Sequence, residues 1–238
     1  MHSATIKRVV ERTGVRHLFH ANTVTTATTF LESGGLLSRG AVERRGLSQT
    51  DQASDALDKR FDIFDDIFLD TVDIHEQAGR RNAYGPVLFV YSIDVLDDLS
   101  ETDIVVTKVN PVRWPGTTEG ERVFLDEDDL ERDFSWNDFG QCLMIKHRLS
   151  PLGFDHLEKV ILDSPGDTYK QLVDAAYDHL YPLVKEHAPS SRLVFRNHWP
   201  DRRRGAEREC GCMSDDPDLP VLGYPSLGED ERLKLFDF

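Results

Sequence analysis

Short apolar runs occupy the middle of the chain and helical patterns lie towards its two ends. This order limits the fold more than any other feature of the sequence. VLFVYSIDVL (residues 87–96) is the clearest strand, and similar runs predict strands at residues 15–19, 67–69, 104–112, 142–149, 159–163 and, at an edge, 191–196. Apolar residues at helical spacing predict a helix over residues 168–187, which Pro182 should kink or shorten. Strands grouped in the middle favour an α+β fold over a doubly wound parallel sheet.

The segment HLFHANTVTTATTFLESGGLLSRG (residues 17–40) joins the first expected strand to a threonine-rich helix. Asn22 or Thr23 is expected to cap this helix, because a short polar side chain accepts hydrogen bonds from the free amides of the first turn. Gly34 should end the helix in the left-handed conformation. Residues 40–60 are small and polar without clear periodicity, so we expect a long functional loop or lid there.

The composition sets the domain organisation. A chain of 238 residues, 39% of them hydrophobic, can bury one sizeable core. We expect one main domain over residues 1–197 and a polar C-terminal tail over residues 198–238, which are rich in Pro, Gly and charge. No apolar stretch approaches the roughly 20 residues of a membrane helix, so we expect a cytoplasmic protein without a membrane partner.

The net charge of −15 disfavours nonspecific binding of nucleic acid over the whole surface, because phosphate groups are repelled within a Debye length. A local basic rim remains open as an alternative. It requires the arginines of several segments to converge on one cleft: Arg44, Arg45, Arg80, Arg81, Arg113 and Arg148.

The sequence lacks the motifs of several common enzyme and cofactor-binding classes. GxGxxG, Walker and GxSxG patterns are missing, which excludes the usual Rossmann, P-loop and hydrolase interpretations. The pair Cys210 and Cys212, with His198 before it, matches no standard zinc spacing, so no metal is expected.

His20 stands where the first strand gives way to the helix. A histidine at a strand end either bonds a nearby carbonyl as a structural group or binds a ligand, and the residue type by itself leaves both open.

The whole stretch FHANTVTTATTFLESGGLLS resembles, without gaps, the start of the DarT family of NAD-dependent ADP-ribosyltransferases. In that family an aromatic-His-x-Thr segment opens onto a helix and a Gly-x-Leu-Leu clip. The resemblance continues in order through DDIFLDTVDIHE, VLFVYSIDVL, IVVTKVNPVRW, the partly helical FLDEDDLERDFSW and CLMIKHRLSPLGFDHLEKVIL, covering about residues 15–163. No single motif is specific; their order and spacing support the resemblance.

The resemblance implies an ADP-ribosyltransferase-like split, mostly antiparallel β core with flanking helices and NAD in the cleft. His20 would then bond the nicotinamide-side ribose or amide, and Asn22 takes the place of the family's threonine. The pocket would be lined by Phe68, Thr71 and His75. Arg60 would match the family arginine that pairs with the phosphates of NAD.

Cleavage of the nicotinamide–ribose bond builds positive charge on the sugar, which a carboxylate stabilises. The family places a glutamate at the start of the last core strand, where this chain has Gln141. A glutamine cannot neutralise the developing cation. Three alternatives therefore stay open: Asp138 supplies the carboxylate, another acid such as Asp70 does, or the domain binds NAD without turning it over.

The expected function is that of an NAD-dependent ADP-ribosyltransferase that modifies a nucleic-acid base, for example thymidine of single-stranded DNA, in a toxin–antitoxin or defence role. The expected partners are NAD, single-stranded nucleic acid and an antitoxin protein. The alternatives are a transferase acting on protein or a small molecule, a catalytically impaired NAD-binding module, and an α+β domain of another kind.

Overall fold

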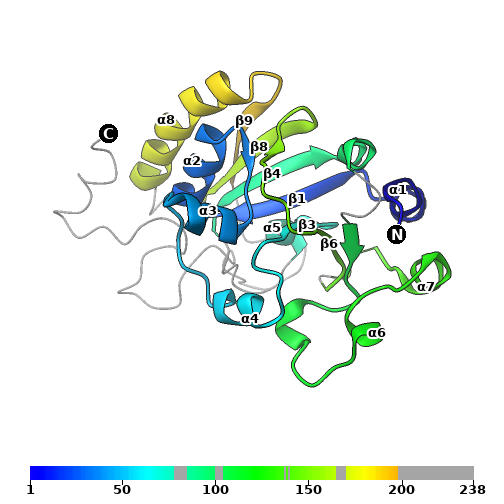
Figure 1. The fold of residues 1–238 in the computed structure, drawn as a ribbon. Coiled ribbons are helices and arrows are strands. Elements are labelled where there is room, and N and C mark those ends of the chain that lie inside the picture. The colour runs from blue at the N-terminus through cyan, green and yellow to red at the C-terminus, as the bar shows by residue number, and fades with distance from the viewer. Residues whose placement is uncertain (78–84, 100–103, 137, 139, 165–169, 198–238) are drawn as a thin grey trace, which may run out of the picture.

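A twisted sheet of seven strands forms the centre of the molecule, as the computed structural model shows (Figure 1). The structure describes residues 1–77, 85–99, 104–136, 138, 140–164 and 170–197. In the sheet the strands follow the order β5-β6-β3-β1-β4-β8-β9, and a second sheet pairs β2 with β7. The strands are β1 (His17–Asn22), β2 (Gly35–Leu36), β3 (Ile67–Asp70), β4 (Val87–Ser92), β5 (Ile104–Val106), β6 (Cys142–Ile145), β7 (Leu152–Gly153), β8 (Leu157–Ser164) and β9 (Arg192–Asn197).

Helices cover the sheet and its ends. The α-helices are α1 (Ser3–Arg12), α2 (Val24–Glu32), α3 (Arg39–Arg45), α4 (Asp55–Arg60), α5 (Ile74–Gln77), α6 (Glu119–Arg122), α7 (Glu127–Asp133) and α8 (Lys170–His187), and the 3₁₀ helices are η1 (Ile93–Asp98) and η2 (Pro111–Arg113). The pairs within the large sheet are antiparallel, except that β9 runs parallel to β8. The expected α+β class with a mostly antiparallel β core is confirmed.

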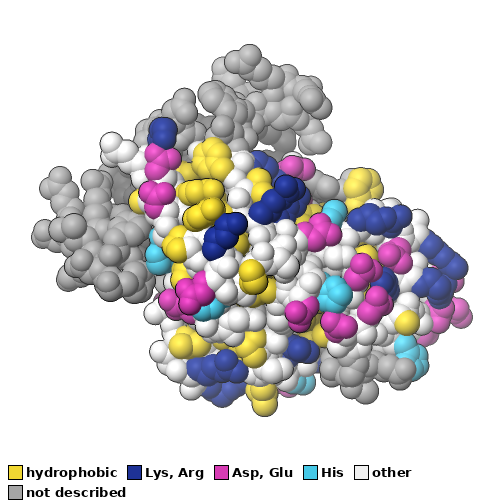
Figure 2. Space-filling view, turned by 90° about the horizontal axis from the view of Figure 1, so that it is seen from above, with side chains coloured by type: hydrophobic (Ala, Val, Ile, Leu, Met, Phe, Trp, Pro, Cys, Tyr) yellow, Lys and Arg dark blue, Asp and Glu magenta, His cyan; other side chains and the backbone are white. Residues whose placement is uncertain are grey.

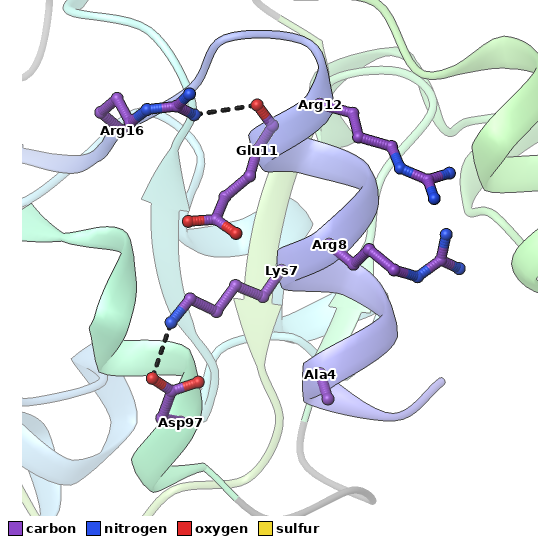
Figure 3. Close-up of a pocket in the computed structure, with 7 residues that line it drawn as sticks. All are labelled: Ala4, Lys7, Arg8, Glu11, Arg12, Arg16 and Asp97. Atoms are coloured by element: carbon purple, nitrogen blue, oxygen red, sulfur yellow. Dashed lines mark hydrogen bonds and ion pairs between the residues drawn. The ribbon is translucent and has the colours of Figure 1, made fainter.

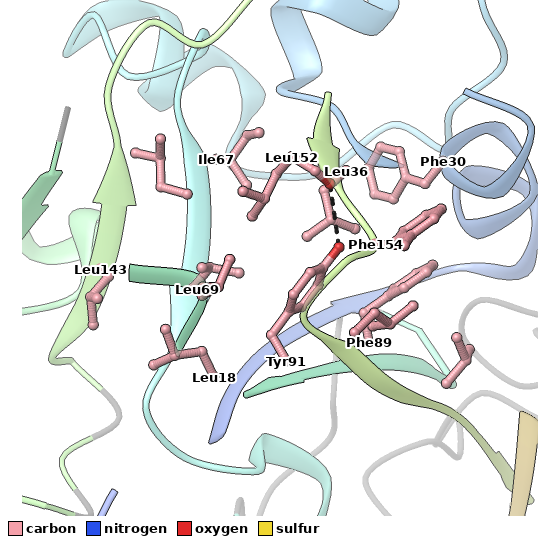
Figure 4. Packing of buried hydrophobic residues seen from close by; sticks show 14 of the residues in the cluster. Leu18, Phe30, Leu36, Ile67, Leu69, Phe89, Tyr91, Leu143, Leu152 and Phe154 are labelled. Atoms are coloured by element: carbon pink, nitrogen blue, oxygen red, sulfur yellow. Dashed lines mark hydrogen bonds between the residues drawn. The ribbon is translucent and has the colours of Figure 1, made fainter. Parts of the chain in front are cut away.

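The alternation of side chains along the strands builds two apolar layers. One face of the sheet meets α1, α2, α3 and α8 in the main core, whose centre is shown in Figure 4. There Phe89 stacks on Phe154, and the Tyr91 hydroxyl donates to the carbonyl of Leu152 at 3.4 Å. The opposite face carries a smaller cluster that includes Ala21, Leu88 and residues beside α5.

The sheet is split between β1 and β3. Strand β1 pairs with β4 along its whole length, but it meets β3 only at Phe19 opposite Asp70. Beyond that pair the two halves of the sheet separate. The expected split in the β core therefore lies at the C-terminal half of the first strand.

Most expected strands and caps are confirmed. Thr23 is the N-cap of α2 and accepts a hydrogen bond from the Thr26 amide at 3.3 Å. Gly34 has a φ of 71°, as expected for a residue that ends a helix. The predicted strand at residues 104–112 ends at Val106, and the run after Ser92 turns into η1 instead of continuing as a strand.

Three expectations are wrong or incomplete. Residues 40–60 are not one long loop, because α3 and α4 occupy much of that segment. Helix α8 runs through Pro182 to His187 without ending; Pro182 is exposed, and buried Leu180 and Val184 hold the turns around it on the core. Helix α1 has no counterpart among the elements expected from sequence, although Ile6, Val9 and Val10 have helical spacing and are buried. The expected tail at residues 198–238 lies outside the described residues.

Candidate functional site at the split of the sheet

His20 fills the point where the two halves of the sheet separate. Its Nδ1–H donates to the carbonyl of Phe68 on β3 at 2.8 Å, so the side chain replaces a backbone hydrogen bond that the split removes. Its Nε2 accepts from the Asn22 side-chain amide at 3.1 Å. The imidazole ring lies 5.6 Å from the ring of Phe30 on α2, on the main-core side of the sheet.

This environment keeps His20 neutral. The pKa of the ring is lowered to about 4, mainly because the ring is removed from water; the hydrogen bond to Phe68 acts in the opposite direction, and the charge of Arg39 contributes to the lowering. A neutral imidazole with a defined tautomer offers one fixed donor and one fixed acceptor, which suits recognition of a polar ligand as well as a structural role.

A continuous series of hydrogen bonds leads from His20 to Arg39. The side-chain oxygen Oδ1 of Asn22 accepts from the Thr23 amide at 3.2 Å, and the Thr23 and Thr50 hydroxyls are 2.8 Å apart. The carbonyl of Thr50 accepts from Nη2 of Arg39 at 3.1 Å. The split of the sheet and the start of α3 therefore form one polar unit.

Arg39 is held firmly in this unit. Its Nε and Nη2 both donate to the carboxylate of Asp55, with the Nη2–Oδ2 distance 2.6 Å, and only 15% of its side chain is exposed. Its Nη1 is buried without a hydrogen-bond partner among the described residues. Nearby Asp58 is buried, and desolvation raises its pKa to about 6. Sequence reasoning missed Arg39 and Asp58; a local signal for Arg39 is Ser38, the residue before it, which is the N-cap of α3.

The end of β3 supplies a second acidic group. Asp70 pairs with Phe19 and with Cys142, at the last position before the split opens. Desolvation raises the pKa of its carboxyl to about 7. The hydroxyl of Thr71 donates to the carbonyl of Gln141 at 3.1 Å and so ties β3 to the segment before β6.

Hydrogen bonds to nearby residues hold the side chain of Gln141. Its Oε1 accepts from the Ser135 amide at 2.8 Å, its Nε2 donates to the Asp133 carbonyl at 3.3 Å, and the residue is 7% exposed. The side chain therefore anchors the end of α7 to the start of β6. Asp138 is exposed, and its carboxylate accepts from the Gly140 amide at 2.8 Å within a turn.

The remaining predicted site residues lie in different parts of the structure. The side chain of Phe68 packs with Trp114 and Met144 in a third cluster. His75 bonds Asp163 on β8, and its neighbour Ile74 belongs to the cluster on the face opposite His20. Arg60 is exposed at the end of α4, with its guanidinium 5.6 Å from the ring of Phe61. The structure thus brings together His20 and Asn22, and separately Thr71 and Gln141.

The arginines of the expected basic rim gather only in part. Arg45 of α3 donates to the carbonyl of Leu149, next to Arg148, at 2.7 Å, whereas Arg44 is neutralised by Asp65 at 2.6 Å. Arg113 lies apart in η2, and residues 80 and 81 are outside the described residues. On the face shown in Figure 2, Lys and Arg alternate with Asp and Glu among the side chains that are drawn in colour.

An open pocket of about 640 Å³ lies elsewhere, along α1 (Figure 3). Most of its charges are already paired: Lys7 bonds Asp94 and Asp97, and Arg8 bonds Glu127 and Glu131. Because these charges already have partners, the pocket along α1 is a poorer candidate for a ligand site than the split of the sheet.

Two absences hold for the part of the chain that the structure describes. Within it, no three His, Cys, Asp or Glu side chains are grouped so that they could hold a metal ion. Cys210 and Cys212 lie beyond it. None of the described helices has the length and apolarity to span a bilayer.

Comparison with known proteins gives matches among solved structures. No family model and no curated protein matches the sequence. DarT from Thermus sp. 2.9 in complex with ADP-ribosylated ssDNA is similar at 13% identity, over 76% of this chain and 94% of that chain, with a TM-score of 0.49. Its complex with NAD+ (14%, 77% and 96%, TM-score 0.46) and its complex with carba-NAD+ (13%, 77% and 96%, TM-score 0.46) are also similar. These structures belong to the family that the sequence resembles.

Proposed function

We propose that this protein is an NAD-dependent ADP-ribosyltransferase whose site is the split of the sheet. The observation that supports this function best is the arrangement at the pair Phe19 and Asp70, where β1 and β3 separate. A neutral imidazole, His20, lies just beyond this pair on the main-core face, and a desolvated carboxyl, Asp70, belongs to the pair on the face of Phe19, so a ligand that contacts both groups would have to lie in the split itself. These are the two kinds of group that transfer of a glycosyl cation needs: a fixed polar contact for the ribose and an acid near it.

In the proposed reaction one bond forms, one bond breaks and one proton is released. A nucleophile of the acceptor attacks C1′ of the nicotinamide ribose, the bond from C1′ to the ring nitrogen breaks, and nicotinamide leaves with its electron pair. The acceptor loses a proton. In this proposal Asp70 stabilises the positive charge that builds on the ribose and then takes the proton, for which a pKa of about 7 is well matched.

Asp70 is preferred to Gln141 for this role. Gln141 cannot supply a charge, and both ends of its amide are used within the segment between α7 and β6. His20 and Asn22 would contact the ribose or the amide of nicotinamide; Arg60, exposed at the end of α4, is the phosphate-binding candidate that the family resemblance suggests. Thr71, Phe68 and His75 would support the pocket from the strand β3 and the segment after it.

For the acceptor we propose a base of single-stranded nucleic acid, with thymidine of DNA as the first choice, in a toxin–antitoxin or defence role. The sequence resemblance to the DarT family motivates this choice. DarT of Thermus sp. 2.9 has been solved with ADP-ribosylated ssDNA and with NAD+, which makes both molecules suitable probes. The proximity of Arg45 and Arg148 offers a local basic contact despite the net charge of −15.

The experiment is incubation of the full chain with NAD+ and a thymidine-containing single-stranded DNA, with RNA and a protein mixture as parallel acceptors. Free nicotinamide and the mass of the acceptor are measured. We expect nicotinamide release and one added ADP-ribose on DNA, and loss of both in Asp70→Asn and His20→Ala, with circular dichroism showing that both variants are folded. If only protein is modified, the proposed acceptor is wrong but the proposed transferase activity is supported. If wild-type protein releases no nicotinamide with any acceptor, the transferase proposal fails.

One observation favours a second function. Because a glutamine stands where the family has its glutamate and is used structurally, the domain could bind NAD without turning it over. Calorimetry separates the two functions: heat of NAD+ binding without nicotinamide release supports a binding module.

A further inference from the structure

Arg39 is a cation with a largely buried side chain that hydrogen bonds link to the candidate site. Five hydrogen bonds connect the carbonyl of Phe68 to Arg39, through His20, Asn22, Thr23 and Thr50. The last links are held by the segment of residues 46–54, here named the strap, which crosses the start of α2. Arg39 thus belongs to the same polar unit as the imidazole.

The hydrogen bonds of Arg39 are incomplete. Nε and Nη2 both donate to the carboxylate of Asp55, and Nη2 also donates to the Thr50 carbonyl. Nη1 has no acceptor among the described residues. A buried donor of a charged group without an acceptor is costly, and native proteins retain few of them. The side-chain oxygen of Gln49 is also buried without a partner, and Gln49 bonds the backbone of Arg39 at 3.2 Å. Two unsatisfied polar atoms therefore lie under the strap.

We propose that Arg39 is the anion-binding residue of the site, and that its Nη1 donates to a phosphate oxygen of a dinucleotide when the strap moves aside. This inference rests on the proposed function and goes beyond it, because it assigns the phosphate to a residue outside the sequence-derived set. A guanidinium already oriented by a carboxylate loses little conformational freedom when it binds an oxyanion.

The comparison with Arg60 explains the choice. The side chain of Arg60 is exposed at the end of α4, and its contact in the structure is a ring, that of Phe61. An exposed arginine must be ordered and desolvated on binding, which offsets part of the contact. Arg39 is ordered in advance, and its charge already acts on His20.

The test compares five variants of the full chain: Arg39→Met, Arg39→Lys, Asp55→Asn, Arg60→Met as the competing phosphate-binding candidate, and Arg192→Met, exposed on β9, as the control. Calorimetry measures the Kd for NAD+ and for ADP-ribose, and NMR follows the titration of the His20 ring. We expect Arg39→Met to weaken both ligands by about tenfold or more, since one charge-assisted hydrogen bond is lost. Arg39→Lys should lose less, and Arg60→Met should change Kd by less than about threefold.

The direction in which Asp55→Asn changes the Kd for NAD+ distinguishes an anion-binding Arg39 from a structural ion pair. It removes the negative partner but keeps the guanidinium, so NAD+ should bind as well as to wild type or more tightly. The pKa of His20 should rise in Arg39→Met and should not rise in Asp55→Asn. If Arg39→Met and Asp55→Asn weaken binding equally, the pair is only a structural ion pair and the inference is overturned.

Other outcomes are equally informative. Normal NAD+ binding by folded Arg39→Met overturns the inference and leaves the proposed function intact. Failure of wild type to bind NAD+ overturns both, and the pKa of His20 then still shows whether Arg39 is electrostatically coupled to the split. Circular dichroism identifies a variant that fails to fold. If Arg39→Met is that variant, Arg39→Lys decides: a smaller but measurable weakening with intact structure supports a specific phosphate contact, and an unchanged Kd contradicts it.

Discussion

Gln141 shows, at the scale of a single residue, how hydrogen bonds decide a role that residue type leaves open. Its position before β6 suggests a catalytic site, but its amide joins Ser135 to Asp133. An amide is suited to this bridge because it donates at one end and accepts at the other. A carboxylate would face the Asp133 carbonyl with a second acceptor.

We therefore expect Gln141→Glu to lower the free energy of unfolding by about 1–3 kcal/mol and to leave nicotinamide release unchanged. Urea denaturation and the NAD+ assay measure the two effects. Gln141→Met, similar in shape but without either hydrogen bond, is the control. A gain of turnover in Gln141→Glu that Gln141→Met lacks would show that position 141 faces the ligand after all.

Asp70 gives a pH dependence with a definite sign. Its pKa is raised from 3.8 to about 7, so the folded state binds a proton that the unfolded state releases. This contribution to stability is fully present below about pH 4 and is lost as the pH rises towards 7. Asp70→Asn should consequently raise the free energy of unfolding by about 2–4 kcal/mol at pH 8 and change it little at pH 4. Denaturation at both pH values checks this; Asp51→Asn, at an exposed position, should show no such difference.

At the scale of elements, the strap behaves unlike the helices beside it. It is mostly exposed, and three threonines of the α2 region hold it: the Thr29 hydroxyl donates to the Ser48 carbonyl at 2.6 Å, and Thr23 and Thr26 bond Thr50. Such a segment buries little apolar surface, so it can open without unfolding the core. The lid expected from sequence for residues 40–60 is thus reduced to these few residues between two helices.

Thr29→Val should loosen the strap selectively. Valine keeps the shape but leaves the Ser48 carbonyl without its donor, so amide exchange at residues 46–54 should become about 5- to 30-fold faster, equivalent to roughly 1–2 kcal/mol. Thermal stability should fall little. Thr25→Val, on the same helix, is the matched control; equal acceleration in both variants would contradict the assignment of the strap's anchor.

At the scale of the whole molecule, one arginine joins the last strand to the rest of the sheet. Arg196 on β9 bonds Asp163 on β8 at 2.8 Å and Asp73 before α5 at 2.6 Å, and the Asp163 side chain is fully buried. His75 bonds the same aspartate. This network ties β9 and the segment before α5 to β8 on the face opposite His20. The hydrogen bond of His75 to Asp163 is part of it.

Removal of Arg196 should destabilise the whole domain, because buried carboxylates would lose their counter-charge. We expect Arg196→Met to lower the free energy of unfolding by about 3–5 kcal/mol in chemical denaturation. Arg192→Met, exposed on the same strand, should change it by less than about 0.5 kcal/mol. Similar losses in the two variants would mean that strand packing, not the ion pairs, holds β9.

The sequence by itself determined the local features that depend on neighbours along the chain: the cap at Thr23, the left-handed Gly34, and the periodic apolar residues of α8 and of strands such as β3 and β8. The tertiary structure decided where polar side chains point and which partners they find. His20 and His75 both follow apolar segments, but the split between β1 and β3 and the alternation of the strands send them to opposite faces. Because these partners are brought together from distant parts of the chain, local pattern alone could not identify Arg39 or the bonds of Gln141.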